Sequence, residues 1–113
     1  MTKDDSIYIK HIRKAISKIE KYTLNKSHDK FIKNDLMQDG VIRQLEIIDE
    51  ATKKLSDKFR DEYSFVPWKD TAGTRDKLIH DYFGVDLEAV WDTVQKDIPL
   101  LRDNLEIIIR KEK

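Results

Sequence analysis

The longest helical pattern of this chain is DLMQDGVIRQLEIIDEATKKLSDKFR, residues 35–60. Its apolar residues recur at three- and four-residue steps, the spacing that places side chains on one face of a helix. These residues are Met37, Val41, Leu45, Ile48, Leu55 and Phe59, with Ala51 or Thr52 filling the gap. The pattern predicts one helix from about Asp35 to Arg60. Gly40 lies inside it at a cost of up to about 1 kcal/mol relative to Ala, and close helix packing is the usual reason for such a glycine.

A second helical pattern precedes this one, from about Ser6 to Tyr22. Its buried stripe consists of Ile9, Ile12, Ile16 and Ile19. Between the two patterns, residues 25–34 are expected to form a connector with a short turn around Phe31.

Downstream, Pro67 suits the first turn of a third helix, where its missing N–H is no loss. That helix would end near Tyr82, with Gly84 available as a cap. Its inward residues would be Trp68, Ala72, Leu78 and Ile79.

Asp86 is a plausible N-cap for a fourth helix, and Pro99 should kink or restart the chain near Ile98. The apolar faces of this last region are Leu87, Val90, Trp91 and Val94, followed by Leu101, Leu105 and Ile108. Four or five amphipathic helices with short connections predict an all-α, up-and-down bundle.

The composition limits the alternatives. With 113 residues, the chain suits a single domain spanning residues 1–113. Its 22 basic and 22 acidic residues give zero net charge, which excludes a strongly basic nucleic-acid coat but not a local basic patch. No cysteine is present, so thiol chemistry and cysteine-bound metals are excluded. Without an apolar run near the roughly 20 residues of a membrane span, or an N-terminal signal core, we expect a soluble cytoplasmic protein with no membrane partner.

The stretch RDKLIHDY, residues 75–82, combines a guanidinium, an imidazole and a phenol. On a regular helix Arg75 and His80 lie about 140° apart, so one intact helix cannot easily bring both onto one small group. Asp76 and His80 are four residues apart and share a face. Either the helix ends near His80, or a second copy of the chain completes the site, which predicts a two-fold homodimer.

These residue types suit cleavage of RNA without a metal. His80, with a pKa near neutrality, could take the proton of the 2′-hydroxyl or protonate the leaving 5′-oxygen. Arg75 could hold the phosphate and stabilise its developing charge. Asp76 could orient His80 and favour its charged form.

The pattern R-x-x-x-x-H-x-Y in RDKLIHDY resembles the signature of the HepT-like proteins of the HEPN superfamily. The flanking sequence resembles the family as well, in residues 38–57 and 67–105. The resemblance implies a metal-independent endoribonuclease, the toxin of a type VII-like toxin–antitoxin pair, with the catalytic arginine and histidine at Arg75 and His80 in a homodimer interface. It also implies a minimal nucleotidyltransferase antitoxin as partner, which transfers AMP to Tyr82. No metal or cofactor is implied for this chain.

A non-catalytic function remains open from the residues alone. The chain could be a helical subunit that presents nucleic acid or a nucleotide to a nucleotidyltransferase. The polar stripe of Arg43, Glu46 and Glu50 could face a groove or simply be solvated. His11 and His28 are expected to face solvent without partners.

The balanced charge predicts weak RNA binding that is confined to a groove and depends on salt. Affinity for a single-stranded RNA, measured by fluorescence anisotropy, should fall as salt rises, because each phosphate contact releases a counterion. An affinity that is equal at low and high salt would contradict this expectation.

Overall fold

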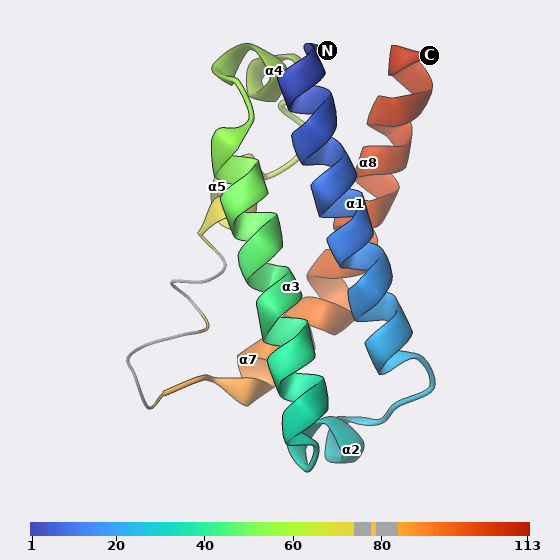
Figure 1. Ribbon diagram of the computed structural model, residues 1–113, viewed down its shortest axis with the longest axis vertical. Helices are drawn as coiled ribbons and strands as arrows, with labels where there is room; N and C mark the ends of the chain where they lie inside the picture. The colour runs from blue at the N-terminus through green and yellow to red at the C-terminus, as the bar shows by residue number, and fades with distance from the viewer. Residues whose placement is uncertain (74–77, 79–83) are drawn as a thin grey trace.

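A computed structural model describes residues 1–73, 78 and 84–113. The elements in chain order are α1 (Lys3–Thr23), α2 (His28–Ile32), α3 (Asp35–Lys54), α4 (Asp57–Glu62), α5 (Trp68–Ala72), α7 (Leu87–Asp92), the π-helical turn η1 (Thr93–Asp97) and α8 (Ile98–Glu112). The long helices α1 and α3 run side by side in opposite directions, and α8 lies alongside them and ends near the N-terminus (Figure 1). The expected all-α bundle is confirmed.

The packing of α1 against α3 forms the centre of the core. The isoleucine stripe of α1 is buried, with Ile12 and Ile19 fully inaccessible, and each such side chain contributes about 1.5–3 kcal/mol through burial. Gly40 of α3 lies against Tyr22 of α1, where an added Cβ would lie 3.2 Å from a ring carbon. Close packing is therefore the reason for the glycine, as its position in the pattern indicated.

The expected continuous helix up to Arg60 is wrong. Helix α3 ends at Lys54, Leu55 is extended at φ −63° and ψ 142°, and α4 begins at Asp57 with Ser56 as its N-cap. The Ser56 hydroxyl accepts a hydrogen bond from the Phe59 N–H at 3.1 Å. Leu55 and Phe59 remain buried on both sides of the break, so apolar spacing alone could not reveal it.

Asp5 of α1 is hydrogen-bonded to Ser56, the residue at this break. Its carboxylate accepts hydrogen bonds from the Ser56 N–H at 2.9 Å and from the Ser56 hydroxyl at 2.7 Å. Burial alone would raise the pKa of the Asp5 carboxyl, but these hydrogen bonds outweigh burial and hold the pKa below its ordinary value. The start of α1 and the end of α3 are thereby joined through one buried carboxylate.

Helices α7 and α8 are joined without a loop, through the π-helical turn η1. Asp86 caps α7 by accepting the Ala89 N–H at 3.0 Å, as expected. The N–H of Ile98 donates to the carbonyl of Thr93, five residues earlier, which is the π-helical pattern. Pro99 follows directly. It has no backbone N–H to donate to the helical hydrogen bonds, and its ring clashes with the preceding turn. The expected restart near Ile98 is therefore confirmed as a π turn that passes into α8.

The ends of α1 and α8 are joined by polar contacts. The N-terminal ammonium lies 2.7 Å from the Glu112 carboxylate, which also accepts the Tyr63 hydroxyl at 2.7 Å. Burial, followed by this hydrogen bond, raises the pKa of Tyr63 to about 12. Two further ion pairs between exposed side chains join the same helices: Arg13–Glu106 and Arg102–Glu20. None of the described helices combines the length and the apolar character needed to cross a membrane.

The break at Ser56 gives a stability prediction. Ser56→Ala removes the α4 cap and one hydrogen bond to buried Asp5, so we expect the free energy of unfolding to fall by about 2 kcal/mol. The matched control Ser27→Ala removes only the α2 cap, whose hydroxyl accepts the Lys30 N–H, and should cost about 1 kcal/mol or less. Urea denaturation of both variants measures the difference, and equal losses would show that the Asp5 bond contributes nothing.

The lowered pKa of Asp5 also predicts a pH dependence. Its contribution is present above the unfolded carboxyl pKa of about 3.9 and is lost as the pH falls through the lower folded pKa. Since Ser56→Ala weakens the hydrogen bonding of the carboxylate, this variant should lose less stability than the wild type on acidification. An identical acid dependence in both proteins would contradict the assignment.

Candidate functional site

Of the segment RDKLIHDY, Leu78 is the one residue that the structure describes. Arg75, Asp76, His80 and Tyr82 lie outside the described residues, as does the expected inward position of Ile79. Leu78 is 4% exposed, and its carbonyl accepts the backbone N–H of Asp86 at 2.9 Å. The centre of the segment is thus held both by apolar packing and by a bond to the residue that caps α7.

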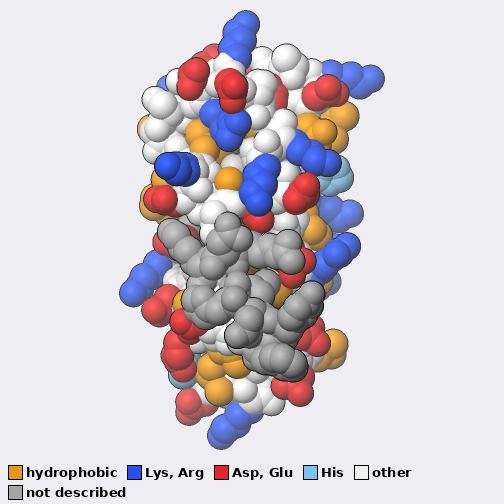
Figure 2. Space-filling model, turned by 90° about the vertical axis from the view of Figure 1, so that its left-hand side faces the viewer, with side chains coloured by type: hydrophobic (Ala, Val, Ile, Leu, Met, Phe, Trp, Pro, Cys, Tyr) orange, Lys and Arg blue, Asp and Glu red, His pale blue; other side chains and the backbone are white. Residues whose placement is uncertain are grey.

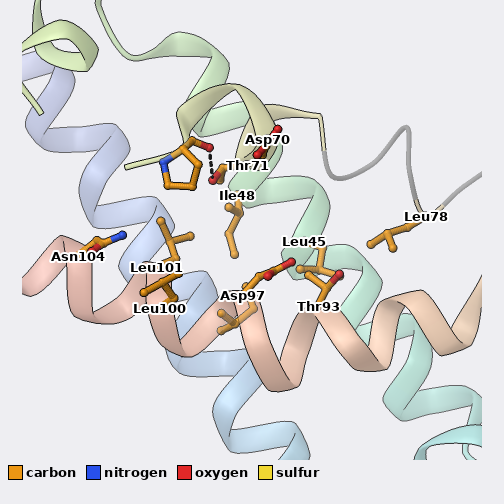
Figure 3. Close-up of a pocket in the computed structure, with 12 residues that line it drawn as sticks. Leu45, Ile48, Asp70, Thr71, Leu78, Thr93, Asp97, Leu100, Leu101 and Asn104 are labelled. Atoms are coloured by element: carbon orange, nitrogen blue, oxygen red, sulfur yellow. Dashed lines mark hydrogen bonds between the residues drawn. The ribbon is translucent and has the colours of Figure 1, made fainter. Parts of the chain in front are cut away.

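Leu78 also lines a cleft of about 220 Å³. The cleft lies between α3, α5, η1 and α8, with side chains from all four elements around it (Figure 3). Its apolar lining comes from buried residues of the core: Leu45, Ile48, Leu78, Ile98 and Leu101. Its polar lining consists of Asp70, Thr71, Thr93, Asp97 and Asn104.

The polar side of the cleft is rich in hydrogen-bond acceptors. Thr71 donates its hydroxyl proton to the Pro67 carbonyl at 3.1 Å (Figure 3), so its oxygen is left as an acceptor. Asp97 adds a carboxylate, and the described lining residues include no lysine, arginine or histidine. These oxygens can accept hydrogen bonds from the N–H donors of a ligand.

Basic side chains lie elsewhere on the same face. In Figure 2 most lysines and arginines lie over the upper half, with acidic side chains among them, and acidic side chains predominate over the lower half. The elements at the upper end are the end of α3, α4 and α5, which carry exposed Lys54, Lys58 and Lys69. The same elements carry exposed acidic residues, Asp57, Asp61, Glu62 and Asp70, so the two charges are mixed at this end of the molecule.

His28 is a residue whose role the sequence did not reveal. The expectation that it lacks partners is wrong: its Nε2 lies 2.7 Å from the Glu88 carboxylate, and its ring packs edge-on against Trp91 at 6.1 Å between centroids. The hydrogen bond to Glu88 raises the pKa of His28 above its ordinary value. This contact links α2 to the start of α7, and no local signal marks it because the partners lie 60 residues apart.

Other expectations for side chains hold. Trp68 is buried, and its indole N–H donates to the Tyr63 carbonyl at 3.0 Å. Trp91 packs on fully buried Phe31 at 5.3 Å between centroids. His11 is exposed.

In the polar stripe on α3, Arg43 and Glu50 are exposed and Glu46 is half-buried, which is compatible with a groove as well as with a solvated face. Over the described part of the chain, no cluster of three or more histidine and acidic residues is arranged to hold a metal.

Comparison with known proteins identifies relatives over almost the whole chain. The family model described as "Ribonuclease HepT-like" matches residues 12–108. A probable ribonuclease HepT of Thermococcus cleftensis is 41% identical over 94% of this chain and 96% of its own length. A putative RNase of Caldanaerobacter subterraneus is 42% identical over 94% of this chain and 95% of its own length.

A longer relative comes from Methanocaldococcus jannaschii and is named gamma-glutamylcyclotransferase and putative RNase. It is 49% identical over 93% of this chain, which spans only 47% of that protein. No solved structure matches the chain.

The position of Leu78 predicts that the cleft and the stability of the bundle are linked. Leu78→Ala removes a buried side chain from the cleft wall and should lower the free energy of unfolding by about 2–4 kcal/mol. Leu100→Ala is the matched control, because Leu100 also lines the cleft but is 56% exposed, and it should change stability by less than about 0.5 kcal/mol. Chemical denaturation compares the two, and a negligible effect of Leu78→Ala would contradict the anchoring contact.

Proposed function

The chain belongs to the HepT-like ribonuclease family, and from that premise we propose that it is a metal-independent endoribonuclease that acts as a homodimer. The observation that carries the proposal is the family match over residues 12–108, which includes the intact residues Arg75, His80 and Tyr82. The relatives named as RNases cover nearly the whole chain.

In the proposed reaction the 2′-oxygen of RNA attacks the adjacent phosphorus and the bond from phosphorus to the 5′-oxygen breaks. One His80 accepts the 2′-hydroxyl proton, and His80 of the second copy donates a proton to the leaving 5′-oxygen. Arg75 stabilises the charge on the non-bridging oxygens. The products are a 2′,3′-cyclic phosphate and a 5′-hydroxyl, and no metal is required.

The proposed homodimer is supported by the spacing of Arg75 and His80. These residues diverge by about 140° on a regular helix, so a second copy across a two-fold axis would supply what one intact helix cannot, unless the helix ends near His80. The exposed Lys54, Lys58 and Lys69 would bind phosphates of the RNA backbone.

The control of this activity is a second part of the proposal. Tyr82 lies two residues after His80, so an AMP group on its phenol oxygen would add bulk and negative charge beside the scissile phosphate. Transfer of AMP from ATP, with release of pyrophosphate, would be catalysed by a minimal nucleotidyltransferase that acts as antitoxin. The ribonuclease would then be the toxin of the pair.

The test is cleavage of an end-labelled RNA in EDTA by the wild type and by His80→Ala. We expect the wild type to cut and to leave 2′,3′-cyclic phosphate ends. Loss of the general acid and base should slow His80→Ala by about 10²–10⁴-fold, with the dimer and the helical circular dichroism retained. His11→Ala is the matched control, because it removes an exposed imidazole outside the segment, and it should cut at the wild-type rate.

Equal cleavage by His80→Ala and the wild type would reject His80 as catalytic. If neither protein cuts, an intact-mass measurement decides between a modified ribonuclease and a non-catalytic subunit. An added AMP would point to a blocked toxin, whereas an unmodified, inactive dimer would favour the non-catalytic binding subunit.

A further inference from the structure

We infer that the cleft lined by Leu78 is a subsite for a guanine base of the RNA, next to the phosphate that is cut. The inference rests on the proposed ribonuclease function, which it deepens by naming the base that is recognised.

The size of the cleft fits a single base. Its volume of about 220 Å³ lies below the roughly 300–1,000 Å³ of sites that enclose a drug-sized ligand, so it suits one flat ring system and not a whole nucleotide. The aliphatic side chains of Leu45, Ile48 and Leu101 form apolar walls (Figure 3). Such walls offer apolar contact to the faces of an unstacked base, and it is such splayed-out bases that proteins read in single-stranded RNA.

The polar groups are arranged around these walls along one helical face. Asp97, Leu101 and Asn104 follow each other at steps of four and three residues, so they share a face. Figure 3 shows Asp97 and Asn104 on opposite sides of Leu101. Thr93 and Asp97 are the first and last residues of η1, and both line the cleft. Single π-helical turns are frequent at functional sites, and this one brings a hydroxyl and a carboxylate to the same cleft.

The acceptors select among the four bases. A carboxylate only accepts hydrogen bonds, through two oxygens. Guanine presents two neighbouring donors, N1–H and the N2 amino group, and can therefore bind both oxygens of Asp97 at once. Adenine and cytosine offer a single amino group and uracil a single imino group. The carboxylate of Asp97 therefore favours guanine over the other three bases.

The position of the cleft connects this base to the chemistry. Leu78 lies two residues before His80 in the sequence, and two residues of chain span at most about 7 Å. A base bound against Leu78 would thus bring its own ribose and phosphate to the segment that carries the proposed catalytic residues. The described lining residues include no basic side chain, so the proposal assigns the phosphate to Arg75.

The first test measures binding apart from cleavage, using methyl-labelled protein and the four nucleoside monophosphates. We expect GMP to shift the methyl signals of Ile48, Ile98 and Leu101 at a concentration at least about 10-fold below that needed for AMP, CMP or UMP. Asp97→Asn should weaken GMP binding by about 10-fold or more. The matched control Asp103→Asn alters an exposed carboxylate on α8 outside the cleft and should bind GMP as the wild type does.

The second test uses DNA oligonucleotides that each contain one ribonucleotide, because only that residue carries the 2′-hydroxyl nucleophile. Wild-type cleavage should be fastest at guanosine, and Asp97→Asn should lower kcat/KM at guanosine by about 10-fold or more while leaving the other three substrates unchanged. An equal response to all four nucleotides, or a guanine preference that survives Asp97→Asn, would overturn the inference while any RNA cleavage still supports the proposed function.

The opposite combination is also distinguishable. Selective GMP binding in a protein that cuts no RNA would retain the guanine site and reject the ribonuclease. If an arginine-rich peptide shifts the same methyl signals and GMP does not, the cleft belongs to a protein partner and the inference is wrong.

Discussion

The antiparallel contact between α1 and α3 is the constraint on which the rest of the structure depends. It buries the isoleucine stripe of α1 and brings Gly40 against the ring of Tyr22. An added Cβ at position 40 would lie 3.2 Å from the Tyr22 ring, so the ring would have to shift slightly, and the glycine suits this close approach of the two helices. Every other described element packs directly or indirectly on this pair, since α5 and α2 contact α3 and α8 contacts α1.

The break at Ser56 allows α5 to pack on α3, and residues of both helices line the cleft. A helix that continued to Arg60 would carry the chain straight on, away from the bundle. Instead α3 ends at Lys54 and the short α4 reverses the path, so that α5 returns to pack on α3. The carboxylate of Asp5 stabilises this change by accepting hydrogen bonds from the Ser56 N–H and the Ser56 hydroxyl, at a helix start where backbone N–H groups lack partners within the helix.

In the proposed function, the cleft and the exposed lysines would bind different parts of the RNA. The cleft combines apolar walls with carboxylate and hydroxyl acceptors, which suit the N–H donors of a base. Lys54, Lys58 and Lys69 are exposed on neighbouring elements. They can bind phosphates although the net charge of the chain is zero, because the local field depends on where the charges lie.

By itself the sequence determined the helical class, the buried stripes, the N-cap at Asp86, the short turn around Phe31 and the family signature in residues 75–82. These signals are local, because helix periodicity and capping depend on neighbours within a few residues. Tertiary structure alone decided that α3 stops at Lys54, that His28 pairs with Glu88, and that Leu78, Asp97 and Asn104 line one cleft. In each case the partners are brought together only by folding: Asp5 meets Ser56 across 51 residues, a distance over which no spacing rule of a single helix applies.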